Sequence, residues 1–299
     1  MLGTVPELPE VEALAGFLRE RLVGRAVDSV EIGAISALKT YDPQPTALRG
    51  LGVTAVNRHG KFLDLDVDGL HLIFHLARGG WLRWNDTAVK TMLKPGKSPL
   101  ALRVRFTPKL DDPQDESTPG FDLTEAGTKK RLAIYVVRTP QEVPGIATLG
   151  PDPLADGFTR DVFAGILQGH RQQIKGLLRD QSTIAGVGNA YSDEVLHAAR
   201  MSPFALAAKL DDNQVTTLYE ALQSTLRTAI AAAAGKPAKE LKDAKRAGLA
   251  VHARTGEKCP VCGDVVREVS FADSSLQYCA TCQTGGKPLA DRRMSKLLK

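Results

Sequence analysis

Cys259-Pro-Val-Cys262 and Cys279-Ala-Thr-Cys282, separated by sixteen residues, contain every cysteine of the 299-residue chain. Each pair places two thiolates close enough to share one tetrahedral ion. The sixteen intervening residues have the length of a β-hairpin that folds one pair onto the other. Since so small a segment has little core of its own, a metal would supply much of its folding free energy. The spacing predicts one structural Zn²⁺ bound by Cys259, Cys262, Cys279 and Cys282.

Buried or redox-active thiols are the alternative explanation of the same four residues. The rest of the chain lacks a basic, apolar and small-residue secretion signal, and lacks an apolar run of about 18 residues that could span a bilayer. We therefore expect an intracellular protein in a reducing compartment. A reducing compartment favours metal ligation over disulfide formation.

The net charge of +5 and the isoelectric point near 9.0 indicate a polyanionic partner, with nucleic acid ahead of an acidic membrane surface. The charge is unevenly distributed. An acidic run covers residues 111–116, whereas Arg292, Arg293, Lys296 and Lys299 lie in the last eight residues. Positive charge is therefore concentrated toward the C-terminus.

The N-terminal region predicts a helix followed by a β domain. Val11, Leu14, Leu18 and Leu22 recur at helical spacing after a proline, and Gly24 ends the pattern. Leucines and valine at 63, 65 and 67 then alternate with aspartates at 64, 66 and 68, which predicts a half-buried strand ending in a turn at 68–69. Further strands are predicted at 70–76, 80–84, 100–106 and 131–137. Residues 107–130 are rich in Pro, Asp, Thr and Gly, and we expect a mobile surface loop there.

From about residue 150 the pattern becomes helical. Apolar residues three and four apart predict helices at 161–167, 172–179, 189–199 and 211–234. The predicted fold class is α+β, with an N-terminal helix plus β-sandwich, a helical domain and a zinc-finger β-hairpin. The predicted boundaries are 1–140 for the first domain, 150–240 for the second, 250–285 for the finger and 286–299 for a basic tail.

Three separated motifs resemble one family, the formamidopyrimidine-DNA glycosylases and endonuclease VIII enzymes. Pro6-Glu-Leu-Pro-Glu-Val-Glu12 resembles their N-terminal signature, and residues 181–194, QSTIAGVGNAYSDE, resemble their helix–two-turn–helix motif. The cysteine finger matches in spacing and position. Smaller agreements at 60–61, 75–76 and 149–153 follow in the expected order, so the resemblance spans nearly the whole chain.

The resemblance implies base-excision repair in the bacterial cytoplasm, at the nucleoid, by a monomer that acts on damaged double-stranded DNA. A base inside a duplex must be flipped out before an enzyme can reach it. In this family the secondary amine of the N-terminal proline attacks the sugar, expels the base and forms a Schiff base, and elimination then cleaves the strand. The match implies that Pro6 is the nucleophile and Glu7 the general acid/base. Taken alone, the pair would be an ordinary helix start.

The resemblance also assigns residues that contact DNA. Lys61 matches the catalytic lysine of the β domain, although an isolated lysine at a strand start is usually a solvated charge. Asn189 matches a phosphate-binding asparagine, and a helix start there favours an anion; an ordinary N-cap is the compatible alternative. Lys175 and Arg78 are further DNA-binding candidates. The resemblance also includes Glu194, whose role stays open.

The chain departs from the family pattern at three places. Residues 1–5 precede Pro6, whose amide nitrogen would then be neither basic nor nucleophilic, and we expect translation to start at Val5 with removal of the initiator methionine. Ser274 stands where the finger of the family carries an arginine. Arg78 occupies the position where the family carries the methionine that fills the gap left by the flipped nucleotide. The family's second gap-filling segment is not recognisable around 137–144.

Three functions are compatible with this pattern. The leading hypothesis is a bifunctional DNA glycosylase and abasic-site lyase. The second is a catalytically weakened relative that only binds damaged DNA, motivated by Ser274 and the altered gap-filling segments. The third is a zinc-ribbon transcription or RNA-binding factor, which leaves the motif at residues 6–12 unexplained.

Overall fold

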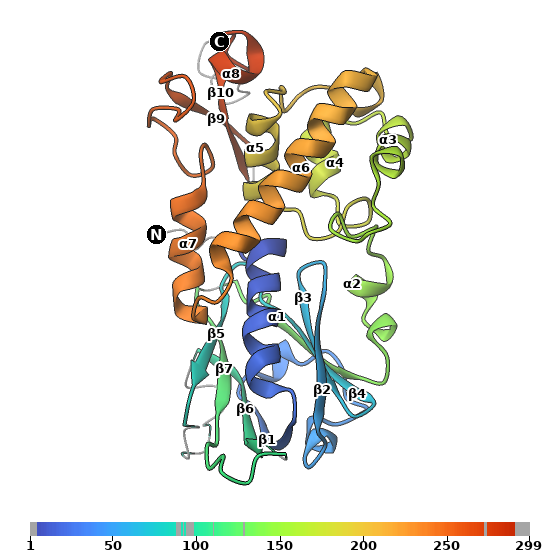
Figure 1. Cartoon of the computed structure of the whole chain (residues 1–299), viewed down its shortest axis with the longest axis vertical. Helices are drawn as coiled ribbons and strands as arrows, with labels where there is room; N and C mark the ends of the chain where they lie inside the picture. The colour runs from blue at the N-terminus through green and yellow to red at the C-terminus, as the bar shows by residue number, and fades with distance from the viewer. Residues whose placement is uncertain are drawn as a thin grey trace. The chain divides into compact units, whose positions relative to one another are not determined.

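The computed structural model describes residues 5–87, 91, 93, 99–109, 111–127, 129–271 and 274–290. The chain divides into two compact units, whose elements Figure 1 shows. Unit 1 comprises Met1–Thr148 with Ala233–Ala244, and unit 2 comprises Leu149–Ala232 with Lys245–Lys299. The predicted zinc finger falls within unit 2. Residues 291–299 of the predicted basic tail lie outside the described residues.

Unit 1 begins with helix α1 (Leu8–Leu22), as the apolar periodicity predicts. A reciprocal capping box at Glu7 and Glu10 starts this helix, and Pro9 occupies its first turn, where a missing N–H costs nothing. The chain then turns at Gly24, which has a φ of 87° that favours glycine. The four predicted apolar positions are each at most 1% exposed, so one face of α1 is buried.

Two four-stranded antiparallel sheets are described in unit 1. One sheet has the order β1-β6-β7-β5, with β1 (Arg25–Ile32), β6 (Leu100–Lys109), β7 (Gly120–Glu125) and β5 (Gly80–Asn85). The other has the order β2-β3-β4-β8, with β2 (Val53–His59), β3 (Phe62–Val67), β4 (Leu70–His75) and β8 (Ala133–Val137). Short helical turns connect or follow these strands: η1 (Ile35–Ala37), η2 (Pro45–Leu48), η3 (Pro140–Glu142) and α2 (Pro144–Ala147).

One hydrophobic cluster includes residues from both sheets and from α1. Its members include Leu18 of α1, Leu65 of β3, Phe74 of β4, and Val104 and Phe121 of β6 and β7. Each of these side chains is completely buried, which gives unit 1 a single core. The predicted N-terminal helix plus β-sandwich is therefore confirmed.

Strand β7 overturns one expectation from the sequence. Residues 107–130 were expected to be a mobile loop, but Gly120–Glu125 form a strand in which every residue is buried, between β6 and β5. Asp122 is tolerated there because Arg103 of β6 binds it through two hydrogen bonds of 2.8 and 3.0 Å. A turn-like composition concealed this strand because its central charge is neutralised by a residue nineteen positions away.

The β3–β4 hairpin follows the predicted alternation with one exception. Asp68 and Gly69 have positive φ values of 48° and 86° and form its two-residue turn, as predicted. Asp64, expected on the exposed face, is 0% exposed. Its two carboxylate oxygens lie 2.9 Å from Nε2 of His59 and 2.9 Å from Nδ1 of His71. Because each carboxylate oxygen has a histidine partner, Asp64 can be buried on the strand face that was expected to be exposed.

The helices of unit 2 agree with the predicted ranges to within two residues at each end. They are α3 (Arg160–Gln168), α4 (Ile174–Arg179), α5 (Asn189–Ala198) and α6 (Asp212–Ala233), with the short turn η4 (Ala207–Lys209). The segment after α6 contains η5 (Ala238–Glu240) and α7 (Leu241–Gly248), a short amphipathic helix that the sequence pattern did not reveal.

The C-terminal part of unit 2 is a hairpin followed by a short helix. Strands β9 (Val266–Ser270) and β10 (Ser275–Cys279) pair antiparallel, and α8 (Ala280–Thr284) follows β10 directly. Val269, Leu276 and Tyr278 form a small buried cluster against Phe204 and Leu289. Throughout the described residues, none of the helices combines the length and apolar character needed to cross a membrane.

Candidate functional site

The predicted nucleophile and general acid/base lie at the start of α1 in unit 1. Pro6 is buried, and Glu7 is only 2% exposed. The backbone N–H of Glu7 donates to Oε2 of Glu10 at 2.9 Å, and the Glu7 side chain in turn accepts from the backbone of Glu10. The capping box therefore holds the Glu7 carboxylate in one position beside Pro6, at the positive end of the helix dipole.

Lys61 lies in the tight turn between β2 and β3, after Gly60 with its positive φ of 56°. A chain of contacts links this turn to α1. Nε of Arg58 donates to Oε2 of Glu12 at 2.7 Å, and Nη1 of Arg58 donates to the carbonyl of Gly60 at 3.4 Å. The Arg58 side chain is only 8% exposed and that of Glu12 is 31% exposed, so this ion pair is partly shielded from solvent. Arg58 therefore holds the turn that carries Lys61 against the first part of α1.

His75, at the end of β4, is electrostatically coupled to Lys61. Burial lowers the pKa of His75 to about 4, and the positive charge of Lys61 makes a smaller contribution in the same direction. The imidazole is therefore neutral near pH 7. Its Nδ1 accepts the backbone N–H of Ala77 at 3.2 Å, which leaves the proton on Nε2. This neutral histidine anchors the base of the loop that carries Arg78.

Arg78 is exposed on a tight loop between β4 and β5. A Cβ on Gly79 would lie 2.3 Å from the carbonyl of Ala126, and one on Gly80 would lie 2.1 Å from the carbonyl of Leu76. Both backbone approaches are hydrogen-bonded, since Gly80 donates to Leu76 and Ala126 donates to Gly79. The two glycines are thus required by close backbone contact, and they hold the loop that presents the Arg78 side chain.

Asn189 is the first residue of α5 in unit 2. Its Nδ2 donates to the backbone carbonyl of Ser275, 2.8 Å away at the start of β10. Its buried Oδ1 has no hydrogen-bond partner among the described residues. A side-chain amide with one unused N–H and an unpaired oxygen carries a cost unless a ligand or water completes it. The helix start therefore lies directly against the finger, close to Ser274.

Lys175 is buried beneath this helix start, with an exposed fraction of 5%. Its Nζ donates to the Asn189 carbonyl at 3.2 Å, to Oγ of Ser192 at 2.8 Å and to Oδ1 of Asp193 at 2.6 Å. Lys175 thus supports the turn on which Asn189 stands. Whether it also contacts DNA stays a prediction.

Glu194, whose role the sequence left open, binds the backbone that leads into the finger. Its two oxygens accept the N–H groups of Ala250, Val251 and His252 at 2.7, 3.0 and 2.8 Å. Burial raises the pKa of this carboxyl, and the three hydrogen bonds oppose that shift. A carboxylate at the centre of three backbone N–H groups fixes the path of the chain between α7 and the finger.

Asp193 and His197, two further residues of α5 that the sequence did not indicate, also contact the segments near the finger. Asp193 accepts from the N–H of Gln277 at 3.2 Å, and its Oδ2 lies 2.8 Å from Nδ1 of His252. His197 places Nε2 3.3 Å from Sγ of Cys259. The only sequence signal was an acidic pair and a histidine spaced three and four residues apart on a predicted helix, which also describes an ordinary solvated face.

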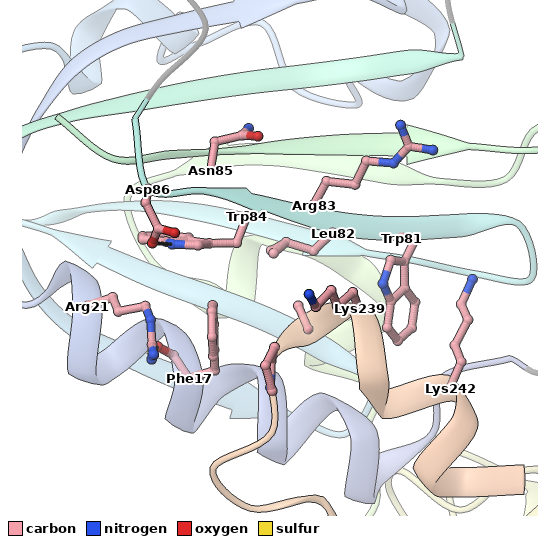
Figure 2. Close-up of a pocket in the computed structure, with 12 residues that line it drawn as sticks. Phe17, Arg21, Trp81, Leu82, Arg83, Trp84, Asn85, Asp86, Lys239 and Lys242 are labelled. Atoms are coloured by element: carbon pink, nitrogen blue, oxygen red, sulfur yellow. Dashed lines mark hydrogen bonds between the residues drawn. The ribbon is translucent and has the colours of Figure 1, made fainter.

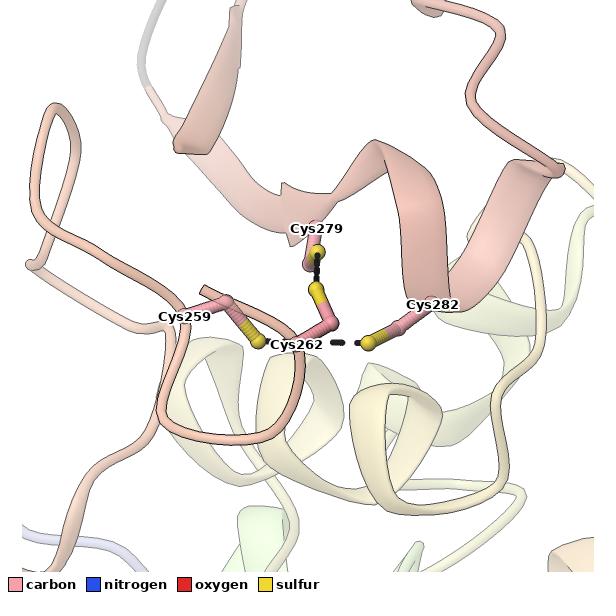
Figure 3. Close-up of side chains that lie close together, drawn as sticks. All are labelled: Cys259, Cys262, Cys279 and Cys282. Carbon is pink, nitrogen blue, oxygen red and sulfur yellow. Dashed lines mark hydrogen bonds between the residues drawn. The ribbon is translucent and has the colours of Figure 1, made fainter. Parts of the chain in front are cut away.

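The four predicted zinc ligands converge from two segments, as Figure 3 shows. Their Sγ atoms all lie within 4.8 Å of one another, with 3.9 Å between Cys259 and Cys282 and 3.4 Å between Cys262 and Cys279. Sulfur atoms around a tetrahedral Zn²⁺ at about 2.3 Å lie about 3.8 Å apart. The donor set and spacing fit one Zn²⁺ with four thiolates, which leaves no open coordination position.

The backbone around the thiols supports metal binding. Cys259 donates its N–H to the Asp264 carbonyl, and Gly263, with a φ of 76°, donates to the Cys259 carbonyl. Burial raises the pKa of the Cys279 thiol to about 11. Without a cation this thiol keeps its proton near pH 7, so a metal must displace the proton. The neutral His197 beside Cys259 can donate to the resulting thiolate.

Three family profiles match the chain in order. The profile of the formamidopyrimidine-DNA glycosylase N-terminal domain matches residues 5–118, and that of the formamidopyrimidine-DNA glycosylase H2TH domain matches residues 149–239. A zinc finger found in FPG and IleRS matches residues 256–285. The three matches cover α1 and strands β1 to β6 of unit 1, helices α3 to α6 of unit 2, and the cysteine finger.

Curated proteins resemble the chain over most of its length. The formamidopyrimidine-DNA glycosylase of Symbiobacterium thermophilum is 33% identical over 303 residues, covering 97% of this chain and 93% of the relative. That of Desulforamulus reducens is 31% identical, covering 93% and 99%. An uncharacterized formamidopyrimidine-DNA glycosylase-like protein of Mycobacterium tuberculosis is 59% identical over 156 residues, covering 52% of this chain and 98% of that protein.

Solved structures also resemble the chain. Lactococcus lactis formamidopyrimidine-DNA glycosylase, noncovalently bound to DNA containing an abasic site, has a TM-score of 0.76 at 25% identity and covers 93% of this chain and 99% of its own. MutM in complex with DNA containing carbocyclic 8-oxo-G has a TM-score of 0.76 at 27% identity, covering 93% and 100%.

Proposed function

Because this chain belongs to the formamidopyrimidine-DNA glycosylase family of DNA-repair enzymes, we propose that it removes oxidised or ring-opened bases from duplex DNA and then cleaves the strand. The observation that carries the proposal is the arrangement at the start of α1. Glu7 is buried in a capping box beside Pro6, and an ion pair between Glu12 and Arg58 links that helix to the turn that holds Lys61. The enzyme acts as a monomer at the bacterial nucleoid.

The proposed nucleophile is the secondary amine of Pro6. An α-amine has an ordinary pKa of about 7.7–8.0, so an appreciable fraction is neutral near physiological pH. Its nitrogen bonds to C1′ of the sugar of a flipped nucleotide, and the bond from C1′ to the base breaks as the base leaves with a proton. The bond from C1′ to the ring oxygen O4′ then breaks as O4′ takes up a proton, which opens the sugar and leaves a Schiff base between Pro6 and C1′. Loss of the C2′ proton from this Schiff base expels the 3′ phosphate, which cleaves the strand. Glu7 is the acid and base for these transfers.

This chemistry requires that Pro6 begin the mature chain. A nitrogen bonded to the carbonyl of Val5 is a tertiary amide and cannot attack C1′. We therefore propose that translation starts at codon 5 and that removal of the initiator methionine exposes Pro6. The match to the N-terminal family profile, which begins at residue 5, supports this start.

The remaining site residues have proposed roles in binding DNA. Lys61 contacts phosphate and lesion, and Arg78 fills the gap left by the flipped nucleotide. Asn189 donates its second amide N–H to a phosphate at the start of α5, where the helix dipole favours negative charge. Lys175 acts through Asn189, because its Nζ holds the Asn189 carbonyl and Asp193.

Borohydride trapping on a duplex that contains an abasic site tests the proposal. A protein beginning at Pro6 should form a covalent adduct, and one beginning at Met1 should not. Glu7→Gln and Lys61→Ala should slow trapping of the Pro6 protein, whereas Lys129→Ala, an exposed lysine of unit 1, should leave it unchanged. Absence of any adduct from a folded Pro6 protein would remove the catalytic assignment.

A damage-binding role without catalysis is the second candidate. It is favoured by Ser274, whose hydroxyl cannot make the bidentate, charged contact of an arginine. A relative of this kind would bind an abasic-site duplex more tightly than intact duplex and give no borohydride adduct. The intact mass of the protein isolated from its own cells shows whether the nitrogen of Pro6 is a free amine. If residues 2–5 are retained, that nitrogen is an amide and only this second role is possible.

A further inference from the structure

A pocket of about 660 Å³ lies within unit 1, apart from the residues assigned to excision. Figure 2 shows its walls: α1, strand β5 and the segment from Pro237 to Lys242. Pro6, Glu7, Lys61 and Arg78 do not line it. Its volume falls in the range of small-molecule binding sites.

Three aromatic rings form the apolar part of the pocket. The rings of Phe17 and Trp84 meet edge to face, with 5.6 Å between centroids and an interplanar angle of 86°. Nε1 of Trp84 donates to Oδ1 of Asp86 at 2.8 Å, which satisfies its one polar group and fixes the indole plane. Trp81 provides the third ring, at the other end of the row of labelled β5 side chains in Figure 2.

Four cationic side chains share this pocket with a single lining carboxylate. The guanidinium of Arg21 lies 3.8 Å from the centroid of Phe17, and Nζ of Lys242 lies 4.3 Å from the centroid of Trp81. Arg83 and Lys239 also line the pocket, as does Asp86. Across the part of the chain that the structure describes, no carboxylate forms an ion pair with Arg83, Lys239 or Lys242.

The surroundings of Lys242 also favour an anion in this pocket. Burial lowers the pKa of its ammonium group, and the nearby charge of Arg83 lowers it further. Both causes disfavour the charged form, and an anion placed between the two cations would relieve both. The pocket therefore combines an excess of positive charge with flat apolar walls.

We propose that this pocket binds a nucleotide unit, with the base against the indole rings and the phosphate held by Arg83, Lys239 and Lys242, while Arg21 adds positive charge at the opposite end of the pocket. Stacking on tryptophan tolerates any base, because every base has a flat π face. Arginine matches phosphate through its planar donors, and lysine contributes point charge. The assignment goes beyond the proposed excision function, since it adds a second place where nucleic acid contacts unit 1.

The same chemistry is available from a free nucleotide or from a nucleotide within a single-stranded DNA segment. A single-stranded segment presents an unpaired base together with a phosphate on each side. Binding of such a segment would be strongly weakened by salt, because phosphate contacts release counterions. The two sources share one binding mode and are distinguished by comparing a mononucleotide with an oligonucleotide.

Tryptophan fluorescence reports on this pocket alone, because the chain contains two tryptophans and both line it. We expect deoxyadenosine monophosphate, titrated at low salt, to quench the emission to saturation. Deoxyadenosine and inorganic phosphate, each carrying half of the recognised chemistry, should bind at least about tenfold more weakly. Failure of both the mononucleotide and a short single-stranded oligonucleotide to give saturable quenching would overturn the proposal.

Substitutions at the rim test the placement of the phosphate. Arg83→Ala combined with Lys239→Ala should weaken mononucleotide binding at least about tenfold, whereas Lys129→Ala, which removes one exposed cation elsewhere in unit 1, should not. Trp84→Phe should keep an aromatic wall and reduce affinity only about threefold. An equal loss in the Lys129 control would mean non-specific charge attraction and would contradict the assignment.

An oligonucleotide that binds at least about tenfold more tightly than the mononucleotide identifies a DNA strand as the source, and equal affinity identifies a free nucleotide. Borohydride trapping of the rim variants keeps the two proposals separate. Because the pocket is apart from Pro6 and Glu7, the Arg83/Lys239 double variant should still be trapped on a short abasic duplex. Nucleotide binding without trapping would support this site and count only against the excision function.

Discussion

Nδ2 of Asn189 donates a hydrogen bond to the backbone carbonyl of Ser275, across 2.8 Å. The contact joins the first residue of α5 to the first residue of β10, which lie 86 positions apart in the chain. The predicted phosphate-binding asparagine and the predicted zinc finger are therefore parts of one structure within unit 2. Connections from Asp193, Glu194 and His197 on the same helix reinforce this arrangement.

Asn189→Ala removes both the finger contact and the proposed phosphate donor. We expect affinity for an abasic-site duplex to fall about tenfold, which corresponds to about 1.4 kcal/mol. Fluorescence anisotropy with a labelled duplex measures this. Asn213→Ala, an exposed asparagine of unit 2, is the matched control and should bind normally. Equal affinities of the two variants would show that Asn189 serves the finger only.

Ser274→Arg places a guanidinium at the finger position where the family resemblance predicts an arginine. Since each additional phosphate contact releases a counterion, we expect tighter binding and a steeper salt dependence, by about one unit in the slope of log affinity against log salt. Thr228→Arg adds the same charge to the exposed surface of α6. If both variants change the slope equally, general charge rather than position is responsible.

His75 makes stability depend on pH in the acidic range. Its pKa is about 4 in the folded protein against an ordinary 6.5, so only the unfolded chain takes up this proton between those values. The contribution of His75 to stability is constant above pH 6.5, and it falls as the pH drops from 6.5 toward 4, by up to about 3 kcal/mol. Urea unfolding at several pH values measures this loss.

Two variants isolate the two causes of the lowered pKa. His75→Asn keeps an acceptor for the Ala77 N–H but cannot be protonated, so this part of the acid destabilisation should disappear. Lys61→Met removes the smaller cause and should recover only a minor part, because burial is the larger one. Complete recovery in Lys61→Met would mean that charge repulsion, not burial, dominates.

Asp64→Ala should strongly destabilise unit 1. The carboxylate is completely buried and lies between His59 and His71, so its removal leaves two partly buried imidazoles without their partner. We expect a loss of about 3–5 kcal/mol in unfolding free energy by urea titration. Asp66→Ala on the same strand, where the side chain is only partly buried, should cost about 1 kcal/mol or less. Similar losses for the two would contradict this explanation.

Removal of zinc should loosen the finger and the residues that α5 holds against it. We expect colorimetric release to yield one Zn²⁺ per chain, and chelation to abolish amide-exchange protection in β9, β10 and residues 250–252. His197→Phe, which removes the N–H beside Cys259 Sγ, should lower zinc affinity about 10–100-fold. His170→Phe is the matched control. Retained protection of the hairpin after complete zinc release would show that its own packing suffices.

The sequence predicted helices α3 to α6 but missed strand β7. Helices α3 to α6 agree with their predicted ranges because each repeats apolar residues within a few positions, and that information is local. Strand β7 was mistaken for loop, since Asp122 becomes acceptable in a buried strand only when Arg103 of β6 lies opposite. Pairing between distant segments is decided by the tertiary structure.

The same division holds for the candidate sites. Cysteine spacing sufficed to predict a four-thiolate zinc site, because two close pairs constrain the geometry by themselves. No spacing revealed that Glu194 binds the backbone of residues 250–252, or that Lys175 is buried against Asp193. In both cases the two partners come from segments of unit 2 that are separated in the sequence.

Local order of residues therefore determined helices α1 and α3 to α6, the zinc ligands and the motifs that identify the family. Tertiary structure alone decided which polar side chains are buried and which groups they meet, as at Asp64, Asn189 and the pocket lined by Trp81 and Trp84. The physical reason is that periodicity and spacing act along the chain, whereas desolvation and charge pairing depend on residues that only folding brings together.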